Sequence, residues 1–178
     1  GGISFGTDKK TLAKLVSKVR LSVKRAVLIT KLSPNVSSIQ EFSKVAEDSG
    51  SDALSLINTI PAMAIDIDTK KPRLANITGG LSGPAIKPIA VRMVWESYNS
   101  VKIPIIGMGG IMNADDAIEF LLAGATAVAV GTANFVNPKS TIEVIDGIEQ
   151  YLKRKGINDV KEIIGSLNAA QFSNYPDI

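Results

Sequence analysis

The chain has 178 residues, of which 45% are hydrophobic, a net charge of +3, and neither cysteine nor histidine. This length and hydrophobic content predict that residues 1–178 form a single globular domain with a substantial core. The missing cysteines exclude disulfides, thiolate metal sites and a cysteine nucleophile within these residues, and the missing histidines remove the commonest general base and metal ligand. We therefore expect no metal site.

Charge and hydropathy also argue against membranes and nucleic acids. No window approaches 18 uninterrupted apolar residues and no signal peptide is recognisable, so we expect a cytoplasmic protein without a membrane span. The basic residues form short clusters without interleaved aromatic residues, which is typical of solvated helix ends and loop tips rather than of a nucleic-acid surface. The clusters are Lys9-Lys10, Lys70-Lys71 and Lys153-Arg154-Lys155.

Segments with helical and strand patterns alternate along the chain. Asp8 and Asn113 are the predicted N-caps of two helices, and Gly50 and Gly124 are predicted helix stops. In chain order, the predicted elements are a helix at 11–24, a strand at 26–32, a helix at 37–49, a strand at 53–57, a helix at 86–98, a strand at 103–106, a helix at 114–123, a strand at 125–130 and a helix at 140–155.

This alternation predicts right-handed βαβ units, a parallel sheet and hence an α/β fold. The predicted strands are apolar on both faces, as parallel strands are when helices cover them. Two architectures fit the pattern. An open doubly wound sheet would be complete with four or five strands, whereas a (β/α)8 barrel would need eight.

Glycines follow the last two predicted strands. The sequence GMGG places Gly109 and Gly110 after strand 103–106, and VGTA places Gly131 after strand 125–130. In barrels, the loops after the last two strands and a short helix start form the usual phosphate site, because unobstructed backbone N–H groups point at the anion. Tight turns alone would explain a single glycine, but glycines at two consecutive strand ends favour phosphate binding.

Polar residues end the two earlier strands. Lys31 closes strand 26–32, and Asn58 and Thr59 follow strand 53–57. A lysine at a sheet rim often extends to solvent, and an asparagine often caps a loop. All three residues nevertheless lie on the edge predicted for the phosphate, so we interpret them as pocket residues.

The motifs of the chain, taken together, resemble a known family. KLSPN, LINT, LANITGGLSGPAIKP, IPIIGMGGI and AVAVGTAN, in this order and spacing, resemble dihydroorotate dehydrogenase over essentially the whole chain. The form INTI…AID…LANITGGLSG is similar to the class 1B branch, whereas the fumarate-using 1A branch tends to have serine at the position of Thr59. The resemblance implies a flavoprotein oxidoreductase on a TIM barrel that uses FMN to oxidise dihydroorotate to orotate in pyrimidine (UMP) biosynthesis.

The resemblance also assigns roles residue by residue. Asn58 and Thr59 match positions that hold the pyrimidine, and an asparagine amide offers both a donor and an acceptor to a pyrimidine edge. Lys31 is implied as the catalytic cation, since a positive charge beside the flavin stabilises the negative charge that the ring takes up with a hydride. The positions that match FMN ligands are Lys31, Ile57, Gly83, Gly109, Gly110, Gly131 and Thr132.

The segment from Thr59 to Gly83 is too long for a plain connection. Alternation at 65–67 and the turn-forming sequence DTKKPR predict a small hairpin. Gly79, Gly80 and Gly83 would then lay backbone against the flavin. The alternative is a mobile surface loop without a role in the site.

The resemblance further implies a missing half. In class 1 enzymes the base that removes the C5 proton is a cysteine on an S-C-P-N loop, and the opening GGISFGTD resembles the stretch just after that loop. We therefore expect this chain to be the C-terminal half of the barrel, its last four βα units, with the base in the N-terminal half. Four strands would leave apolar side chains without partners, including those of Val27, Ile29, Leu54 and Leu56.

Partners follow from the same resemblance. Besides the N-terminal half of the barrel and dihydroorotate or orotate, it implies a homo-oligomer, since many relatives are dimers. For the 1B branch it also implies an iron–sulfur flavoprotein subunit that passes electrons to NAD. Two other functions remain open: a phosphate-binding barrel enzyme without flavin, such as a sugar-phosphate isomerase, and a non-catalytic phosphate-binding module.

Overall fold

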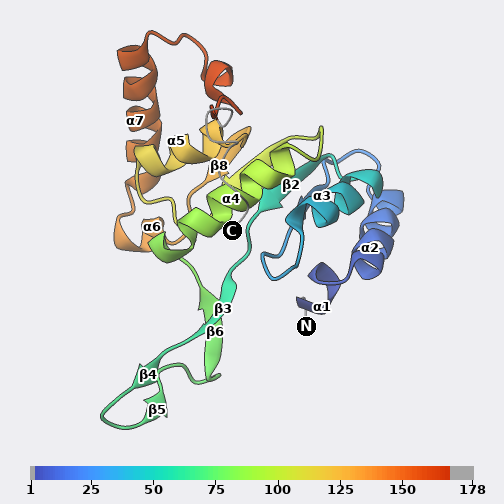
Figure 1. The fold of residues 1–178 in the computed structure, drawn as a ribbon, viewed down its shortest axis with the longest axis vertical. Coiled ribbons are helices and arrows are strands. Elements are labelled where there is room, and N and C mark those ends of the chain that lie inside the picture. Colours follow the sequence, from blue (N-terminus) through green and yellow to red (C-terminus); the bar gives the residue numbers. More distant parts are fainter. Residues whose placement is uncertain (1–2, 169–178) are drawn as a thin grey trace.

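The computed structural model of the protein describes residues 3–168 (Figure 1). Four parallel strands form its main sheet in the order β1-β2-β7-β8, which is also their order along the chain. The α/β fold with a parallel sheet is therefore confirmed. The strands are β1 (Ile29–Lys31), β2 (Ala53–Leu56), β7 (Ile105–Met108) and β8 (Ala127–Ala129).

The strand boundaries differ from the prediction for local reasons. Pairing of β7 begins at Ile105 rather than at residue 103, because Pro104 has no N–H to donate and offers only its carbonyl, which accepts from Leu54 N at 2.9 Å. Before β1, Leu28 is held by Asp52, whose carboxylate accepts from Leu28 N at 2.7 Å. The ladder of β1 therefore starts only at Ile29.

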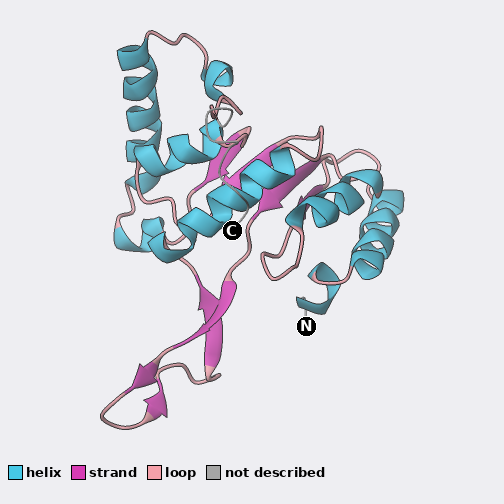
Figure 2. Ribbon diagram, in the orientation of Figure 1, coloured by secondary structure: helices cyan, strands magenta, loops and turns pink. Residues whose placement is uncertain are grey.

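Helices alternate with these strands, and the sheet and its helices form the upper part of Figure 2. The predicted caps are confirmed: the Asp8 side chain accepts from Thr11 N, and the Asn113 side chain accepts from Asp116 N. The long helices are α2 (Lys9–Ser22), α3 (Ile39–Asp48), α4 (Lys87–Tyr98), α5 (Ala114–Leu122) and α7 (Ser140–Lys155), and the short ones are α1 (Ile3–Gly6), α6 (Ala133–Val136) and the 3-10 turns η1 (Pro84–Ile86) and η2 (Val160–Ile163).

The two faces of the sheet differ in burial. Leu54, Leu56 and Ile105 lie on the face that α3, α4 and α5 cover, and each is at most 1% exposed. Ile29 alternates away from that face and is 46% exposed, while Val27, just before β1, is 69% exposed. The expectation of unpartnered side chains is thus confirmed for Val27 and Ile29. It is wrong for Leu54 and Leu56, because their side chains pack under the helices.

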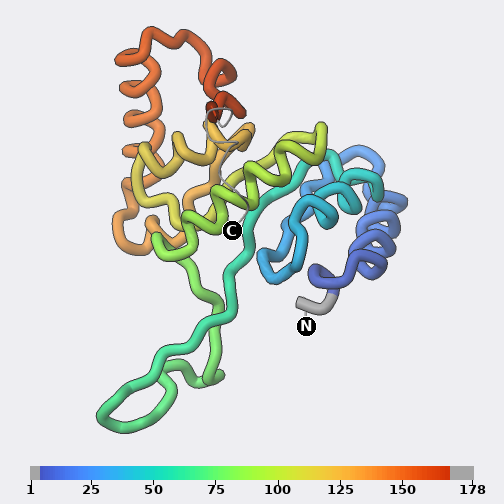
Figure 3. The backbone as a smooth tube through the Cα atoms, viewed as in Figure 1, coloured from blue at the N-terminus to red at the C-terminus, as the bar shows by residue number. Residues whose placement is uncertain are grey.

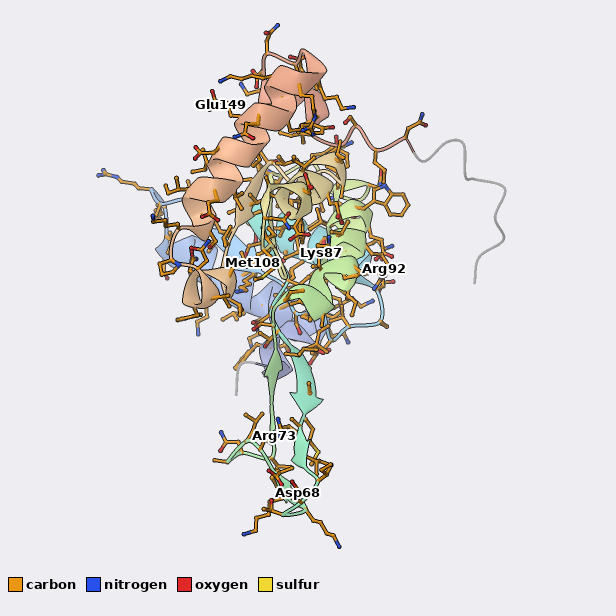
Figure 4. All side chains as sticks on the ribbon, turned by 90° about the vertical axis from the view of Figure 1, so that its left-hand side faces the viewer. Asp68, Arg73, Lys87, Arg92, Met108 and Glu149 are labelled. Atoms are coloured by element: carbon orange, nitrogen blue, oxygen red, sulfur yellow. The ribbon has the colours of Figure 1, made fainter. Side chains whose placement is uncertain are left out.

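Residues 59–83 form a long two-stranded ribbon that projects from the body of the domain (Figure 3). Asp68 and Arg73 lie at its far end, well away from Lys87 and Met108 in the body of the domain (Figure 4). The predicted hairpin is confirmed, and it is longer than predicted. Its antiparallel pairs are β3 (Ile60–Met63) with β6 (Thr78–Leu81), and β4 (Ile65–Asp66) with β5 (Lys71–Pro72).

A helix that crosses a lipid bilayer needs about 20 predominantly apolar residues. None of the helices between residues 3 and 168 is long and apolar enough to meet this requirement.

Candidate functional site

A cavity of about 170 Å³ lies at the carboxyl ends of the sheet strands. Because parallel strands end at the same edge of a sheet, the segments that follow β1, β2, β7 and β8 converge there, joined by the segment between β6 and η1. Every residue that matches a cofactor or substrate position of the family lines this cavity: Lys31, Ile57, Asn58, Thr59, Gly83, Gly109, Gly110, Gly131 and Thr132.

Other lining residues were not predicted. Most are apolar side chains or backbone beside the predicted residues, and such positions carry no chemical signal in a sequence. Ser82 is the exception, because a serine in the glycine-rich sequence GGLSG could have been recognised as a candidate polar site residue. Its hydroxyl oxygen accepts a hydrogen bond from Thr132 Oγ1 at 2.8 Å. The unpredicted residues are Ser82, Ile86, Met108, Ile111, Met112, Ala129, Val130 and Ala133.

A second cavity of about 290 Å³ adjoins the first. Lys31, Asn58 and Thr59 line both, so these three polar residues stand where the two cavities meet. Gly79 and Gly80 line the second cavity, whereas Gly83 lines the first. The backbone of the ribbon therefore contributes to the site only at its base.

Two lysines near the first cavity are in different electrostatic states. Lys87 Nζ lies 2.6 Å from a carboxylate oxygen of Asp116 and 2.6 Å from one of Glu119. Hydrogen bonds to these two carboxylates raise the pKa of Lys87 above its ordinary value. Lys31 is exposed, and no carboxylate within residues 3–168 pairs with it. The charge of Lys31 is thus available to a ligand, whereas that of Lys87 is neutralised within the protein.

Asp116 holds together the elements around Lys87. Burial by itself would raise the pKa of this carboxyl group, but hydrogen bonds from Lys87 and from the backbone N–H groups of Met112 and Asn113 outweigh burial and leave the pKa below its ordinary value. Asp116 therefore remains ionised at neutral pH. It joins α4 to the start of α5 and to the loop that follows β7.

The glycines after β7 are required by the protein itself. Gly109 has φ +125° and Gly110 has φ +82°, backbone conformations that residues with a side chain rarely adopt. A Cβ at Gly110 would lie 2.7 Å from Gly83 O and 2.8 Å from Lys87 Cβ, and a Cβ at Gly109 would lie 3.1 Å from Ala90 Cβ. A side chain at either position would therefore meet protein atoms, whether or not a ligand is bound.

Gly131, after β8, differs from Gly109 and Gly110 both in its backbone conformation and in the contacts that an added side chain would make. Its φ is not in the left-handed region, and a Cβ added there would have nothing within 4 Å. Neither backbone conformation nor packing within the described part of the chain requires glycine at this position. Because Gly131 lines the first cavity, the open space beside it suits a ligand that must approach the backbone closely.

Backbone donors line the same space. The N–H groups of Gly110, Gly131 and Thr132 donate no hydrogen bond to any residue between 3 and 168. Such N–H groups bind anions, and the cationic Lys31 lines the same cavity. The helix that follows, α6, has only four residues, so attraction for an anion would come from the loops and Lys31 rather than from a helix dipole.

Comparisons with known proteins agree on one family. The model of the dihydroorotate dehydrogenase family matches residues 1–152. Relatives named dihydroorotate dehydrogenase B (NAD(+)), catalytic subunit, are 56% identical in Caldicellulosiruptor bescii and 58% identical in Geotalea uraniireducens, in each case over 94% of this chain. These alignments cover 56% and 54% of the relatives, so the chain spans about half their length.

A solved structure shows the same fold. The DHODH of Eimeria tenella, crystallised in complex with ferulenol, matches with a TM-score of 0.76 and 24% sequence identity. The match covers 89% of this chain and 48% of that chain. The four βα units described here are therefore part of a (β/α)8 barrel, and the open doubly wound sheet is excluded.

Proposed function

The chain belongs to the dihydroorotate dehydrogenase family, and we propose that it supplies the cofactor site and part of the substrate site of an enzyme that oxidises dihydroorotate to orotate. One observation carries this proposal. The nine residues that match the family's cofactor and substrate positions come from five separate segments, and all of them line one cavity. The parallel sheet brings the strand-end segments to one edge, and the unpaired Lys31, the polar Asn58 and Thr59 and the glycines found there are residue types expected of a binding site.

FMN is the proposed cofactor. When bound, a flavin supplies a ring that accepts a hydride from carbon. The residues present fit the group: the open space at Gly131 and the free N–H groups of Gly131 and Thr132 suit its phosphate. Lys31, free of any carboxylate in the described residues, would place a positive charge where the ring gains electrons.

Asn58 and Thr59 are the proposed pyrimidine ligands. Asn58 Oδ1 accepts a hydrogen bond from Thr59 N at 3.0 Å, which fixes the amide and leaves its Nδ2 free to donate to a ring carbonyl. Thr59 is itself held in place, because its carbonyl oxygen accepts from Asn35 Nδ2 at 3.4 Å. Asn58 and Thr59 line both cavities, and these hydrogen bonds hold them in place before a ligand binds.

The catalytic base is proposed to lie outside these residues. Oxidation of dihydroorotate removes a proton from C5 and a hydride from C6, and the chain contains neither cysteine nor histidine to take the proton. We assign the base to the part of the barrel that the relatives have and this chain does not cover. Its strands would pair with β1 and β8, which are the two edges of the present sheet.

The electron acceptor is proposed to be reached through a second subunit. The relatives are named as catalytic subunits of an NAD(+)-linked enzyme. An iron–sulfur flavoprotein subunit, as in the class 1B branch, would take electrons from the reduced cofactor to NAD. A homo-oligomer of the catalytic chain remains a prediction.

A visible spectrum tests the proposed function. Purified with the segment that completes the barrel, the protein should be yellow, should release FMN on heat denaturation, and should change its spectrum when orotate is added. A colourless protein that binds inorganic phosphate would instead support a phosphate-binding barrel enzyme without flavin. If that protein also lacked all turnover, the non-catalytic binding module would be the better description.

A further inference from the structure

Asn134, in the first turn of α6, makes an unusually complete set of hydrogen bonds behind the loop after β8. Its Oδ1 accepts from Ser140 Oγ and from Thr141 Oγ1, each at 3.0 Å. Its Nδ2 donates to Val130 O at 2.9 Å. Because both hydroxyls bind the oxygen, the amide is oriented so that its nitrogen faces the Val130 carbonyl.

The backbone of Asn134 holds the next carbonyl of the loop. Asn134 N donates to Gly131 O at 3.1 Å. One residue therefore binds two successive carbonyl oxygens, those of Val130 and Gly131. Peptide units are planar and trans, so the N–H of each unit points away from its own C=O. Holding these two carbonyls thereby aims the N–H groups of Gly131 and Thr132 in the opposite direction.

These two N–H groups are two of the three free donors named above at the cavity. Neither of them donates to another residue in the described range 3–168, and Gly131 and Thr132 both line the first cavity. We infer that Asn134 is a positioning residue: by fixing two peptide planes from behind, it preorganises the donors that bind the cofactor phosphate. This inference rests on the proposed function, and it concerns a residue outside the family-matched ligand positions.

Asn137 provides a matched control in the same segment. Its side chain also makes two hydrogen bonds, donating to Glu143 Oε2 at 2.7 Å and accepting from Lys139 N at 3.0 Å. Both partners lie at the start of α7 or just before it, and neither belongs to the loop after β8. Asn137→Asp therefore makes the same chemical change without touching the carbonyls of Val130 or Gly131.

The experiment compares two cofactors on the complete barrel. Apo-protein is titrated with FMN and with riboflavin, which lacks the phosphate, and the ratio of the two dissociation constants is determined. Asn134→Asp replaces the donor to Val130 O with a repelling oxygen, so FMN binding should weaken by about tenfold. Riboflavin binding and the melting temperature should change little, and Asn137→Asp should leave the ratio unchanged.

Each outcome bears on the inference. If Asn134→Asp does not fold, Thr141→Val removes one orienting hydroxyl from an exposed position and should give a smaller loss of the same selectivity. Equal weakening of FMN and riboflavin, or an unchanged ratio in Asn134→Asp or Thr141→Val, would overturn the positioning role. A parent protein that binds flavin but does not prefer FMN to riboflavin would overturn the phosphate site itself. A parent that binds no flavin at all would overturn the proposed function.

Discussion

The loops after β7 and β8 both bring glycine to the same cavity, but for different physical reasons. At Gly110 a side chain would overlap Gly83 and Lys87, and φ is +82°. At Gly131 an added Cβ would meet no atom of residues 3–168 within 4 Å, and φ is ordinary. The protein requires the first glycine for its own packing, whereas no contact within the described residues requires the second. A glycine pattern in a sequence does not separate these two causes.

The same contrast holds for the two lysines. Lys87, beside the loop after β7, is bound by the carboxylates of Asp116 and Glu119. Lys31, at the end of β1, has no such partner in the described residues. The charge of Lys87 is paired within the protein, whereas that of Lys31 is unpaired in the described residues. The residues beside the loop after β7 are therefore held by contacts within the protein, whereas the charge of Lys31 and the space beside Gly131 have no such contacts in the described residues. We expect function to depend on Lys31 and Gly131.

The largest effect is expected at Lys31. Lys31→Ala in the complete enzyme should leave the melting temperature unchanged but slow flavin reduction by dihydroorotate by about 10²–10³-fold, the loss typical of removing one group that stabilises transition-state charge. Stopped-flow reduction under anaerobic conditions measures this rate. Lys87→Met is the control, and it should lower stability more than the rate. A reduction rate within a few-fold of the parent in Lys31→Ala would remove its catalytic role.

Valine substitutions at Gly131 and Gly110 should affect different quantities, FMN affinity in the first case and apo-protein stability in the second. Gly131→Val should weaken FMN binding by about tenfold or more with an unchanged melting temperature for the apo-protein, because no described atom lies within 4 Å of the added Cβ and the proposed phosphate would occupy that space. Gly110→Val should instead destabilise the apo-protein by roughly 2 kcal/mol or more, since it forces a β-branched residue into the left-handed region and into contact with Lys87. Calorimetry and FMN titration distinguish the two. A large loss of apo-protein stability in Gly131→Val would contradict the contrast.

A smaller and more selective effect is expected at Asn58. Asn58→Ala should retain FMN while weakening orotate binding by about tenfold, since one or two hydrogen bonds to the pyrimidine are lost. Orotate titration monitored by the flavin spectrum measures this change. Release of flavin with orotate binding intact would show that the cofactor and substrate positions have been exchanged.

The smallest effect concerns pH. The pKa of Asp116 is lowered in the folded protein, so its ion pair with Lys87 contributes stability that is complete above the ordinary pKa of 3.8 and is lost as pH falls through the lower folded-state value. The melting temperature of the parent should therefore fall more between pH 6 and pH 3 than that of Asp116→Asn. Asp115→Asn, one residue earlier, is the control. Parallel pH curves for the parent and Asp116→Asn would show that this ion pair does not stabilise the fold.

Much of the architecture could be predicted from the sequence, because periodicity and capping are local. Asp8 and Asn113 cap helices as their positions indicate, and the four parallel strands follow from alternation and short connections. That Lys31, Asn58 and Gly131 line one cavity could be predicted because parallel strands end at one edge of the sheet. Their motifs also resemble a family whose ligand positions are known.

Other features depend on contacts between distant segments. The prediction that Leu54 and Leu56 lack partners is wrong, because a run of apolar residues does not show which face of a strand the helices cover. The length of the ribbon at 59–83 depends on pairing between its two arms. The role inferred for Asn134 depends on Ser140 and Thr141 in the next helix, and a lone asparagine after a glycine loop carries no such signal.

We propose that these residues form the flavin- and pyrimidine-binding part of a barrel that oxidises dihydroorotate. The most direct test is to express residues 1–178 alone and together with the missing half of the barrel supplied as a second polypeptide, and to mix each product anaerobically with dihydroorotate. We predict that only the two-part complex is yellow and that dihydroorotate bleaches its flavin absorbance. A colourless complex, or a monomeric and cooperatively melting 178-residue product that oxidises dihydroorotate by itself, would contradict the claim.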